Sequence, residues 1–231
     1  SRKGTKDFVT AADLRTEKIL KEELSKARPS FSFLIEKSGE TVGTDPNRRW
    51  IVDPINGTTN FMHGIPHFAI SIALQEHGDL IAAVVYNPVL NDLFLAEKGQ
   101  GATLNNRRLR VSGREQLADC VLATGIPHEG HAEQLQSVIS TVAGVRQFGS
   151  TSLDLAFVAA GRVDGFWESS LSICDVAAGI LLVRESGGFV TDIGGKGNGL
   201  EDSSILAANT HIHRPLASLL TKKPGFRHSS S

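Results

Sequence analysis

Three acidic residues stand at positions where secondary-structure elements are expected to end or begin. Glu36 and Asp53 each follow a short apolar run of strand type, and Asp175 directly precedes an apolar helical run. Loops at strand ends are where α/β proteins bind ligands, and carboxylate oxygens suit Mg²⁺. Spacing alone does not show that the three side chains meet. A helix N-cap for Asp175 and a solvated strand end for Glu36 therefore stay open as local roles.

The segment after Asp53 combines a turn with backbone N–H groups that could bind an anion. Pro54 is expected to turn the chain, and Gly57 lacks a side chain where the backbone would have to approach a ligand closely. Thr58 and Thr59 then present N–H groups and hydroxyls. Such a turn, especially one that opens a helix, can bind phosphate. A plain Asx-turn with a helix cap is the alternative interpretation.

The histidines and cysteines do not indicate a zinc site. His63 and His67 are four residues apart, but the glycine and the proline between them exclude a helical pair of ligands, so both are interpreted as structural or loop histidines. Cys120 and Cys174 lie far apart and outside CxxC spacing. Neither a disulfide framework nor a zinc knuckle is indicated, and we expect a reducing, cytoplasmic location.

The elements that must position these residues follow from the hydrophobic pattern. A helix of about 15 residues is predicted from Thr10, and it ends before Pro29. The pattern then predicts strands over 31–35 and 50–52 and an antiparallel meander over 67–74, 80–86, 92–97 and 101–111. After these, strand and helix alternate: a strand over 120–123, helices over about 131–142, 152–160 and 175–185, and a strand over 189–191.

Composition and charge limit the classes of protein that need to be considered. The chain has 231 residues, of which 40% are hydrophobic and 21% charged, so it can form a core without disulfides or a structural metal. Lys and Arg number 24 against 25 Asp and Glu, which argues against nucleic-acid binding driven by bulk charge. No apolar run approaches the roughly 20 residues of a membrane span. We predict a single domain over 1–231, with one half to about 118, an α/β half over about 119–225 and a frayed end at 227–231.

Four motifs resemble, in the same order, those of the inositol monophosphatase family. They are DFVTAAD at 7–13, IEKSGE at 35–40, WIVDPINGTTNF at 50–61 and DVAAG at 175–179. With FGS at 148–150 and AAGRVDGFWE at 159–168, the chain is most similar to the bacterial members called extragenic suppressor proteins. The family's usual first helix is absent, so we expect that the true N-terminus lies before Ser1.

This resemblance implies a layered αβαβα sandwich, a homodimer and Mg²⁺-dependent hydrolysis of a phosphate monoester, with two or three ions per active site that Mn²⁺ can replace. Two metals can activate water and neutralise the leaving group in an in-line displacement. The family's first metal would be bound by Glu36, Asp53 and the Ile55 carbonyl, and a second by Asp53, Asn56 and Asp175. Glu36, Asp13 and Thr58 would be catalytic, the last two by orienting water. Substrate contacts would come from Gly57, Thr58, Thr151, Glu168 and Asp175.

Three positions depart from the family pattern. Asn56 stands where the family has Asp; its amide oxygen could still bind Mg²⁺ but brings no charge, so we predict weaker binding of the second metal and low activity at ordinary Mg²⁺. Lys37 replaces a second acid, and we expect it to point into water rather than compete for Glu36. Cys174 replaces a Trp, which should loosen the packing of the helix start.

Two classes of function follow. The leading hypothesis is a metal-dependent phosphomonoesterase acting on inositol monophosphate or a similar small polyol phosphate, with histidinol phosphate, fructose bisphosphate and a 3′-phosphonucleotide as rival substrates. The alternative is a binding protein of the transcription machinery that retains a vestigial metal site, which the change at Asn56 favours. A third interpretation is an engineered or altered Asn56 that traps substrate.

Overall fold

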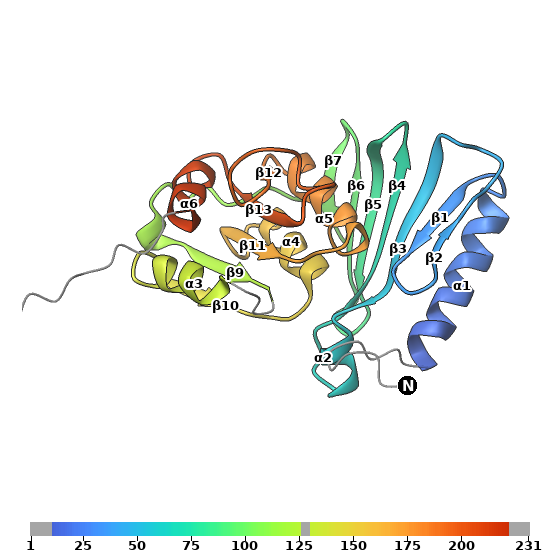
Figure 1. Ribbon diagram of the computed structural model, residues 1–231, viewed down its shortest axis with the longest axis horizontal. Helices are drawn as coiled ribbons and strands as arrows, with labels where there is room; N and C mark the ends of the chain where they lie inside the picture. Colours follow the sequence, from blue (N-terminus) through green and yellow to red (C-terminus); the bar gives the residue numbers. More distant parts are fainter. Residues whose placement is uncertain (1–10, 126–129, 222–231) are drawn as a thin grey trace, which may run out of the picture.

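Two β-sheets and three layers of helices alternate through the molecule (Figure 1). This computed structural model describes residues 11–125 and 130–221; residues 7–10 of the first motif and the predicted frayed end lie outside them. From one side to the other, the layers are α1 (Ala11–Ala27), an eight-stranded sheet, α4 (Thr151–Ala159) with α5 (Ile173–Glu185), a five-stranded sheet, and α3 (His131–Ile139) with α6 (His213–Leu220). The predicted αβαβα sandwich is confirmed.

The eight-stranded sheet contains the predicted meander. Its order is β2-β1-β3-β4-β5-β6-β7-β8. The pairs from β3 to β8 are all antiparallel, whereas β1 runs parallel to β3. The strands are β1 (Ser32–Ile35), β2 (Gly39–Thr41), β3 (Arg48–Asn56), β4 (Ala69–Glu76), β5 (Asp79–Asn87), β6 (Asp92–Glu97), β7 (Gly101–Leu104) and β8 (Arg107–Arg108).

The five-stranded sheet is mixed. Its order is β10-β9-β11-β13-β12, with β9 parallel to β10 and β11, and β13 antiparallel to β11 and β12. The strands are β9 (Val121–Thr124), β10 (Gly144–Arg146), β11 (Gly165–Ser169), β12 (Phe189–Thr191) and β13 (Ser204–Ala208). The sequence pattern did not predict β2, β10, β11, β13, the 3₁₀ turn η1 (Leu117–Asp119) or α6.

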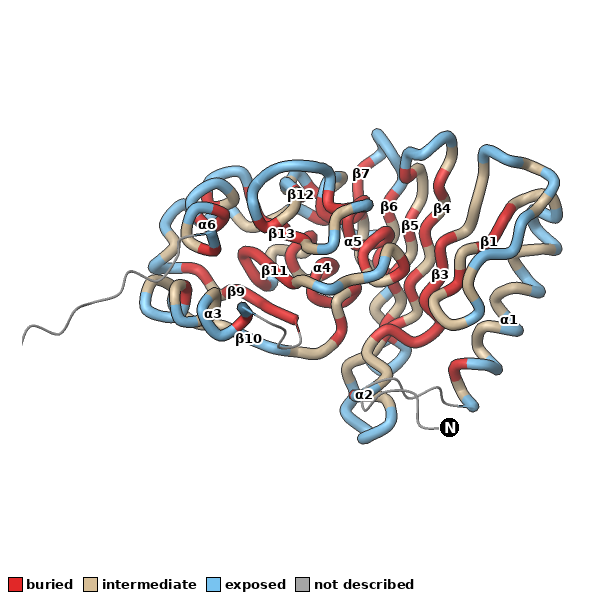
Figure 2. Tube along the Cα trace, in the orientation of Figure 1, coloured by how far each residue is buried: buried red, intermediate tan, exposed pale blue. Residues whose placement is uncertain are grey.

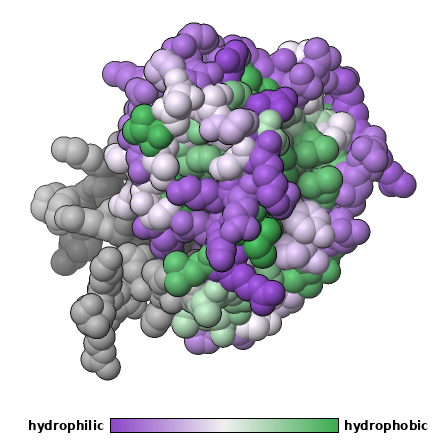
Figure 3. All heavy atoms as spheres, turned by 90° about the vertical axis from the view of Figure 1, so that its right-hand side faces the viewer, coloured by the Kyte–Doolittle hydropathy of each residue, from purple (hydrophilic) through white to green (hydrophobic). Residues whose placement is uncertain are grey.

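The central helix layer is buried on all sides because a sheet covers each of its faces. Figure 2 shows α4 and α5 almost wholly buried, and eight successive residues of α5, Val176–Val183, are buried. The outer helix α1 instead packs one face, through Leu20 and Leu24, on the first sheet. The side of the molecule seen in Figure 3 is mostly hydrophilic with scattered apolar groups. Leu14 in α1 is 57% exposed. Within the described ranges, no helix combines the length and apolar character that a bilayer crossing needs.

Two predicted boundaries are wrong at functionally important positions. Pro54 does not end its strand: β3 continues to Asn56 through a register shift between Asp53 and Asn56, and the chain turns at Gly57. A bulge of this kind lets a strand accommodate proline. The last long helix begins at Ile173 rather than Asp175, because Ser172 is its N-cap.

Candidate active site

The acidic residues predicted from separate motifs approach one another at the end of β3. The backbone N–H of Glu36 donates to the Val52 carbonyl at 3.1 Å, which sets Glu36 beside Asp53 across the parallel pair β1 and β3. The side-chain amide of Asn56 donates to Asp53 Oδ2 at 2.8 Å and to Asp175 Oδ1 at 3.2 Å. The three carboxylates that sequence spacing could not connect therefore surround one small region.

Negative charge is concentrated in this region. Burial raises the pKa of the Asp53 carboxyl well above its ordinary value, and the charges of Glu36 and Asp175 raise it further. The pKa of Glu36 is also raised, first by burial and then by Asp175 and Asp13, while Lys37 opposes the shift. Asp13 is 2% exposed in the first turn of α1. Buried carboxylates in such proximity favour a proton or a bound cation.

The expectation that Lys37 points into water is wrong. Its Nζ donates to Glu36 Oε1 at 2.8 Å, and the two side chains are only 16% and 24% exposed. A partly buried ion pair is screened less by water than a surface pair. The ammonium of Lys37 therefore offsets part of the negative charge of Glu36. A divalent cation at Glu36 would have to share this carboxylate with the ammonium or displace the ammonium.

Asn56 presents nitrogen, rather than oxygen, to the carboxylates. Its Oδ1 accepts hydrogen bonds from the Ser150 hydroxyl at 2.8 Å and from the Ser152 backbone N–H and hydroxyl, both at 2.9 Å. The backbone N–H of Ser152 can only donate. Reversing the amide would therefore place the NH₂ group of Asn56, which is also a donor, against this buried N–H. Leaving a buried donor unsatisfied costs about 1–3 kcal/mol. This orientation differs from the ligand role predicted for the amide oxygen.

The turn after Asn56 is tied to the other half of the chain. Gly57 has φ 91°, in the left-handed region that favours glycine. A Cβ there would lie 3.1 Å from the Gly149 carbonyl oxygen, so the close approach is to the chain's own backbone. The short helix α2 (Thr58–Met62) follows, and the Thr58 hydroxyl donates to the Ile55 carbonyl at 2.9 Å. Phosphate binding by the N–H groups of this turn stays a prediction.

Two predicted substrate-binding residues also meet. Glu168 is 6% exposed in β11, and the Thr151 hydroxyl donates to its Oε2 at 2.6 Å. Gly125 packs against the same carboxylate, where an added Cβ would lie 1.7 Å from Glu168 Cδ. The segment 150–152 thus connects the amide of Asn56 with the Thr151–Glu168 pair.

Sequence reasoning missed the serines that hold the site together. Besides Ser150 and Ser152, Ser172 donates to Asp175 Oδ2 through its backbone N–H at 2.9 Å and its hydroxyl at 2.8 Å. Asp175 is therefore the third helical residue of a capping box and not the N-cap. A serine three residues before an acid was the signal in the sequence for this capping box.

Cys174 is not placed to act as a nucleophile. Burial raises the pKa of its thiol to about 12, and the charges of Asp53, Asp175 and Glu36 act in the same direction. The thiol therefore stays protonated near neutral pH and is unreactive. Both cysteines are free and buried.

The donor set fits one divalent cation better than two. Carboxylate and carbonyl oxygens suit Mg²⁺. A bound cation would stabilise the charged form of Asp53, which burial and the charges of Glu36 and Asp175 disfavour. Glu36, Asp53 and the Ile55 carbonyl supply such oxygens. Across residues 11–125 and 130–221, however, no three His, Cys, Asp or Glu side chains form a ready-made ion site. Between Asp53 and Asp175, the side-chain amide of Asn56 already donates to one oxygen of each carboxylate, Asp53 Oδ2 and Asp175 Oδ1.

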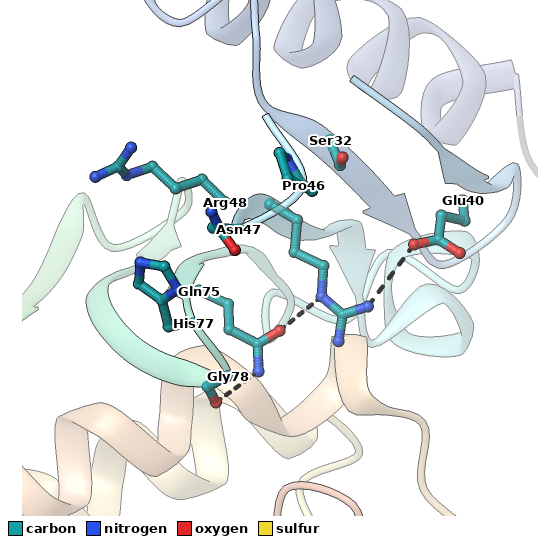
Figure 4. Close-up of a pocket in the computed structure, with 9 residues that line it drawn as sticks. Ser32, Glu40, Pro46, Asn47, Arg48, Gln75, His77 and Gly78 are labelled. Atoms are coloured by element: carbon teal, nitrogen blue, oxygen red, sulfur yellow. Dashed lines mark hydrogen bonds and ion pairs between the residues drawn. The ribbon is translucent and has the colours of Figure 1, made fainter. Parts of the chain in front are cut away.

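A separate pocket lies around the other end of β3. Arg49 Nε donates to Gln75 Oε1 at 2.6 Å, and its guanidinium lies 3.9 Å from Glu40 Oε1. Dashed lines in Figure 4 mark both contacts, which end on the labelled Gln75 and Glu40. Arg48 pairs with Asp45 and Glu76. Because these guanidinium groups already have acidic or amide partners, the pocket does not offer an unpaired charge for a ligand.

Comparison with known proteins agrees with this geometry. A family model described as "Inositol monophosphatase family" matches residues 1–224. This chain belongs to the inositol monophosphatase family. It is 52% identical to the inositol-1-monophosphatase of Rhizobium meliloti (strain 1021), over 96% of the chain and 86% of that relative. It is 45% identical to Nus factor SuhB of Pseudomonas aeruginosa, over 93% and 83%.

Solved structures share the fold. The crystal structure of the extragenic suppressor protein SuhB from Bartonella henselae has a TM-score of 0.94 and 54% identity, over 96% of this chain and 89% of that chain. The inositol monophosphatase from Anabaena (Nostoc) sp. PCC 7120 has a TM-score of 0.88 and 37% identity, over 94% and 89%. The family to which the four motifs were similar is thus confirmed.

Proposed function

We propose that this member of the inositol monophosphatase family is a Mg²⁺-dependent phosphomonoesterase that hydrolyses inositol monophosphate or a similar small polyol phosphate. The observation that carries the proposal is the cluster of Glu36, Asp53 and Asp175 around one buried region, with the Thr151–Glu168 pair connected to it through the 150–152 segment. The family and the names of its relatives support the same reaction.

Each residue of the site has a role in this proposal. Glu36, Asp53 and the Ile55 carbonyl would hold Mg²⁺, which would supply charge neutralisation and a more acidic water. Asp13 and Thr58 would orient the attacking water: the Thr58 hydroxyl donates its proton to Ile55, so its oxygen is left to accept one from water. The N–H groups of Gly57 and Thr58 would bind the phosphate.

The alcohol part of the substrate would contact Glu168. Its carboxylate accepts from Thr151, which fixes its orientation, and a carboxylate oxygen is an acceptor that suits a substrate hydroxyl. A polyol offers several such donors. This favours a small polyol phosphate over a substrate without neighbouring hydroxyls.

A substrate panel tests the proposal. Phosphate release is expected from inositol monophosphate in the presence of Mg²⁺ or Mn²⁺, and faster than from histidinol phosphate, fructose bisphosphate or a 3′-phosphonucleotide. Asp53→Ala should abolish turnover, whereas Asp119→Ala, which changes an exposed acid, should not. Turnover that survives Asp53→Ala would overturn the proposal.

The alternative function is a binding role in the transcription machinery, for which the similarity to Nus factor SuhB is the specific observation. The two functions separate in cells that depend on this protein. If Asp53→Ala keeps the cellular role but loses phosphatase activity, binding is the function that cells need. For either function we propose a cytoplasmic homodimer, with the two free cysteines consistent with a reducing compartment.

A further inference from the structure

The side-chain amide of Asn56 uses all of its hydrogen-bonding groups within the acidic cluster. Its nitrogen donates to Asp53 Oδ2 and Asp175 Oδ1, and its oxygen accepts from Ser150 and twice from Ser152. The residue is 4% exposed. The amide therefore joins two carboxylates that would otherwise repel each other, and it does so from a fixed orientation.

We propose that the amide nitrogen of Asn56 takes the place of a second divalent cation, so that this site holds one ion fewer than the same site with aspartate at position 56. The inference rests on the proposed function and specifies its metal content. An ion between Asp53 and Asp175 would need the oxygens to which the amide now donates. The amide and the ion are alternatives, because they occupy the same position.

The serines decide which end of the amide faces the carboxylates. For the amide oxygen to face an ion, its nitrogen would have to face the Ser152 backbone N–H, which is a donor that cannot become an acceptor. The Ser150 and Ser152 hydroxyls could rotate, but this N–H could not. The oxygen of Asn56 is thereby kept away from the metal position.

An aspartate at position 56 would reverse the preference. One of its oxygens could accept the bonds from Ser150 and Ser152, while the other would face Asp53 and Asp175. Three carboxylates would then converge with no donor between them, and a cation would be required to hold them together. The wild-type chain does not have this requirement, since the amide supplies two donors there.

Counting bound Mn²⁺ tests the inference without reference to activity. The full chain and Asn56→Asp are dialysed against Mn²⁺, and bound ions are counted while electron paramagnetic resonance detects spin-coupled pairs. Peptide mass analysis first establishes that residue 56 is still an amide, because asparagine followed by glycine is prone to deamidation. We expect Asn56→Asp to bind one more ion than wild type and to show a coupled pair that wild type lacks.

A matched variant controls for the added charge. Asn87 is 1% exposed, and its Oδ1 accepts from the N–H groups of Val89 and Leu90, an arrangement that an aspartate oxygen can keep. Asn87→Asp should leave the ion count unchanged. Thermal unfolding adds a second measurement: with a chelator, Asn56→Asp should unfold at a lower temperature than wild type, and Mn²⁺ should raise its unfolding temperature more.

The outcomes separate this inference from the proposed function. A spin-coupled pair of ions in the wild-type chain overturns the inference, while hydrolysis of inositol monophosphate by that same sample leaves the proposed function standing. If neither chain binds Mn²⁺, both fail. If Asn56→Asp does not fold, the wild-type count and spectrum alone decide, because a coupled pair there still overturns the inference.

Discussion

At position 56, an amide nitrogen stands where a ligand oxygen was expected, and the difference should be measurable in catalysis. We predict that Asn56→Asp increases turnover at low Mg²⁺ by about 10- to 100-fold, a range typical of losing one group that supports a metal site. Wild type should stay below the variant at high Mg²⁺ and with Mn²⁺ as well, because the amide of Asn56 occupies the position of the second ion. Initial rates across a metal titration provide the test, and equal rates at every concentration would show that Asn56 does not limit activity.

A second buried residue, Asp154, should make stability depend on pH. Burial, with the charge of Glu168 adding to it, raises the pKa of Asp154 well above its ordinary value, and neither carboxylate oxygen has a hydrogen-bond partner in the described structure. The folded protein keeps a proton that the unfolded chain releases above about pH 4. The stabilisation from protonated Asp154 is thus complete below that pH and is lost as pH rises through the folded pKa.

Asp154→Asn should remove this contribution, which reaches about 1.4 kcal/mol per pH unit within the window. The free energy of unfolding, measured in urea from pH 4 to pH 8, should fall less steeply with pH in the variant than in wild type. Asp119→Asn, which alters an exposed acid, should keep the wild-type slope. Identical slopes for Asp154→Asn and wild type would refute the prediction.

The sequence predicted which acidic side chains lie close together, but not which neighbouring groups offset their negative charge. Glu36 and Asp53 follow apolar runs that become parallel neighbours, so their proximity follows from local pattern and topology. Ser150 and Ser152 lie 94 and 96 positions from Asn56 along the chain, and no local signal connects them. The orientation of the amide depends on that distant segment, and the contact of Lys37 with Glu36 depends on how far the loop is buried.

The strands of the meander were predictable, whereas two short and uniformly buried strands of the second sheet were not. The strand β4 alternates buried and half-buried residues along its whole length, and the turn signals between the runs predicted the meander. By contrast, β11 and β13 are short and nearly uniformly buried, because helices and neighbouring strands cover them. Without alternation, a run of this length does not distinguish strand from helix.

The close packing of α4 on α5 depends on Gly179. A Cβ at this position would lie 2.4 Å from Leu155 Cδ1 and 2.5 Å from Leu155 Cβ. Alanine favours helix by about 1 kcal/mol over glycine, but overpacking a core costs about 1–3 kcal/mol or more. We predict that Gly179→Ala lowers the free energy of unfolding, as measured by urea denaturation. Gly113→Ala, where an added Cβ meets nothing within 4 Å, is the control; a stabilised Gly179→Ala would contradict the packing.

Across the whole molecule, the two sheets share one core, which argues for the predicted single domain. The largest hydrophobic cluster combines Ile51 and Ala73 of the first sheet with Phe166 and Ile205 of the second, and α4 and α5 lie between them. The amide of Asn60 adds a polar connection, donating to His67 O at 2.8 Å and to Phe148 O at 2.7 Å. If one half of the chain unfolded, the apolar residues of the other half that pack against it would become exposed to water.

Cooperative unfolding is therefore expected, and the two tryptophans make it testable. Trp50 lies in the eight-stranded sheet and Trp167 in the five-stranded sheet, and the chain has no other tryptophan. In Trp50→Phe the fluorescence reports the second sheet, and in Trp167→Phe it reports the first. Within each variant, the fluorescence midpoint in urea should coincide with the midpoint of far-ultraviolet circular dichroism, which reports all helices and strands. Comparing two probes within one variant removes the effect of the substitution on stability. Midpoints that separate in either variant would mean that the sheets unfold independently and that the chain has two domains.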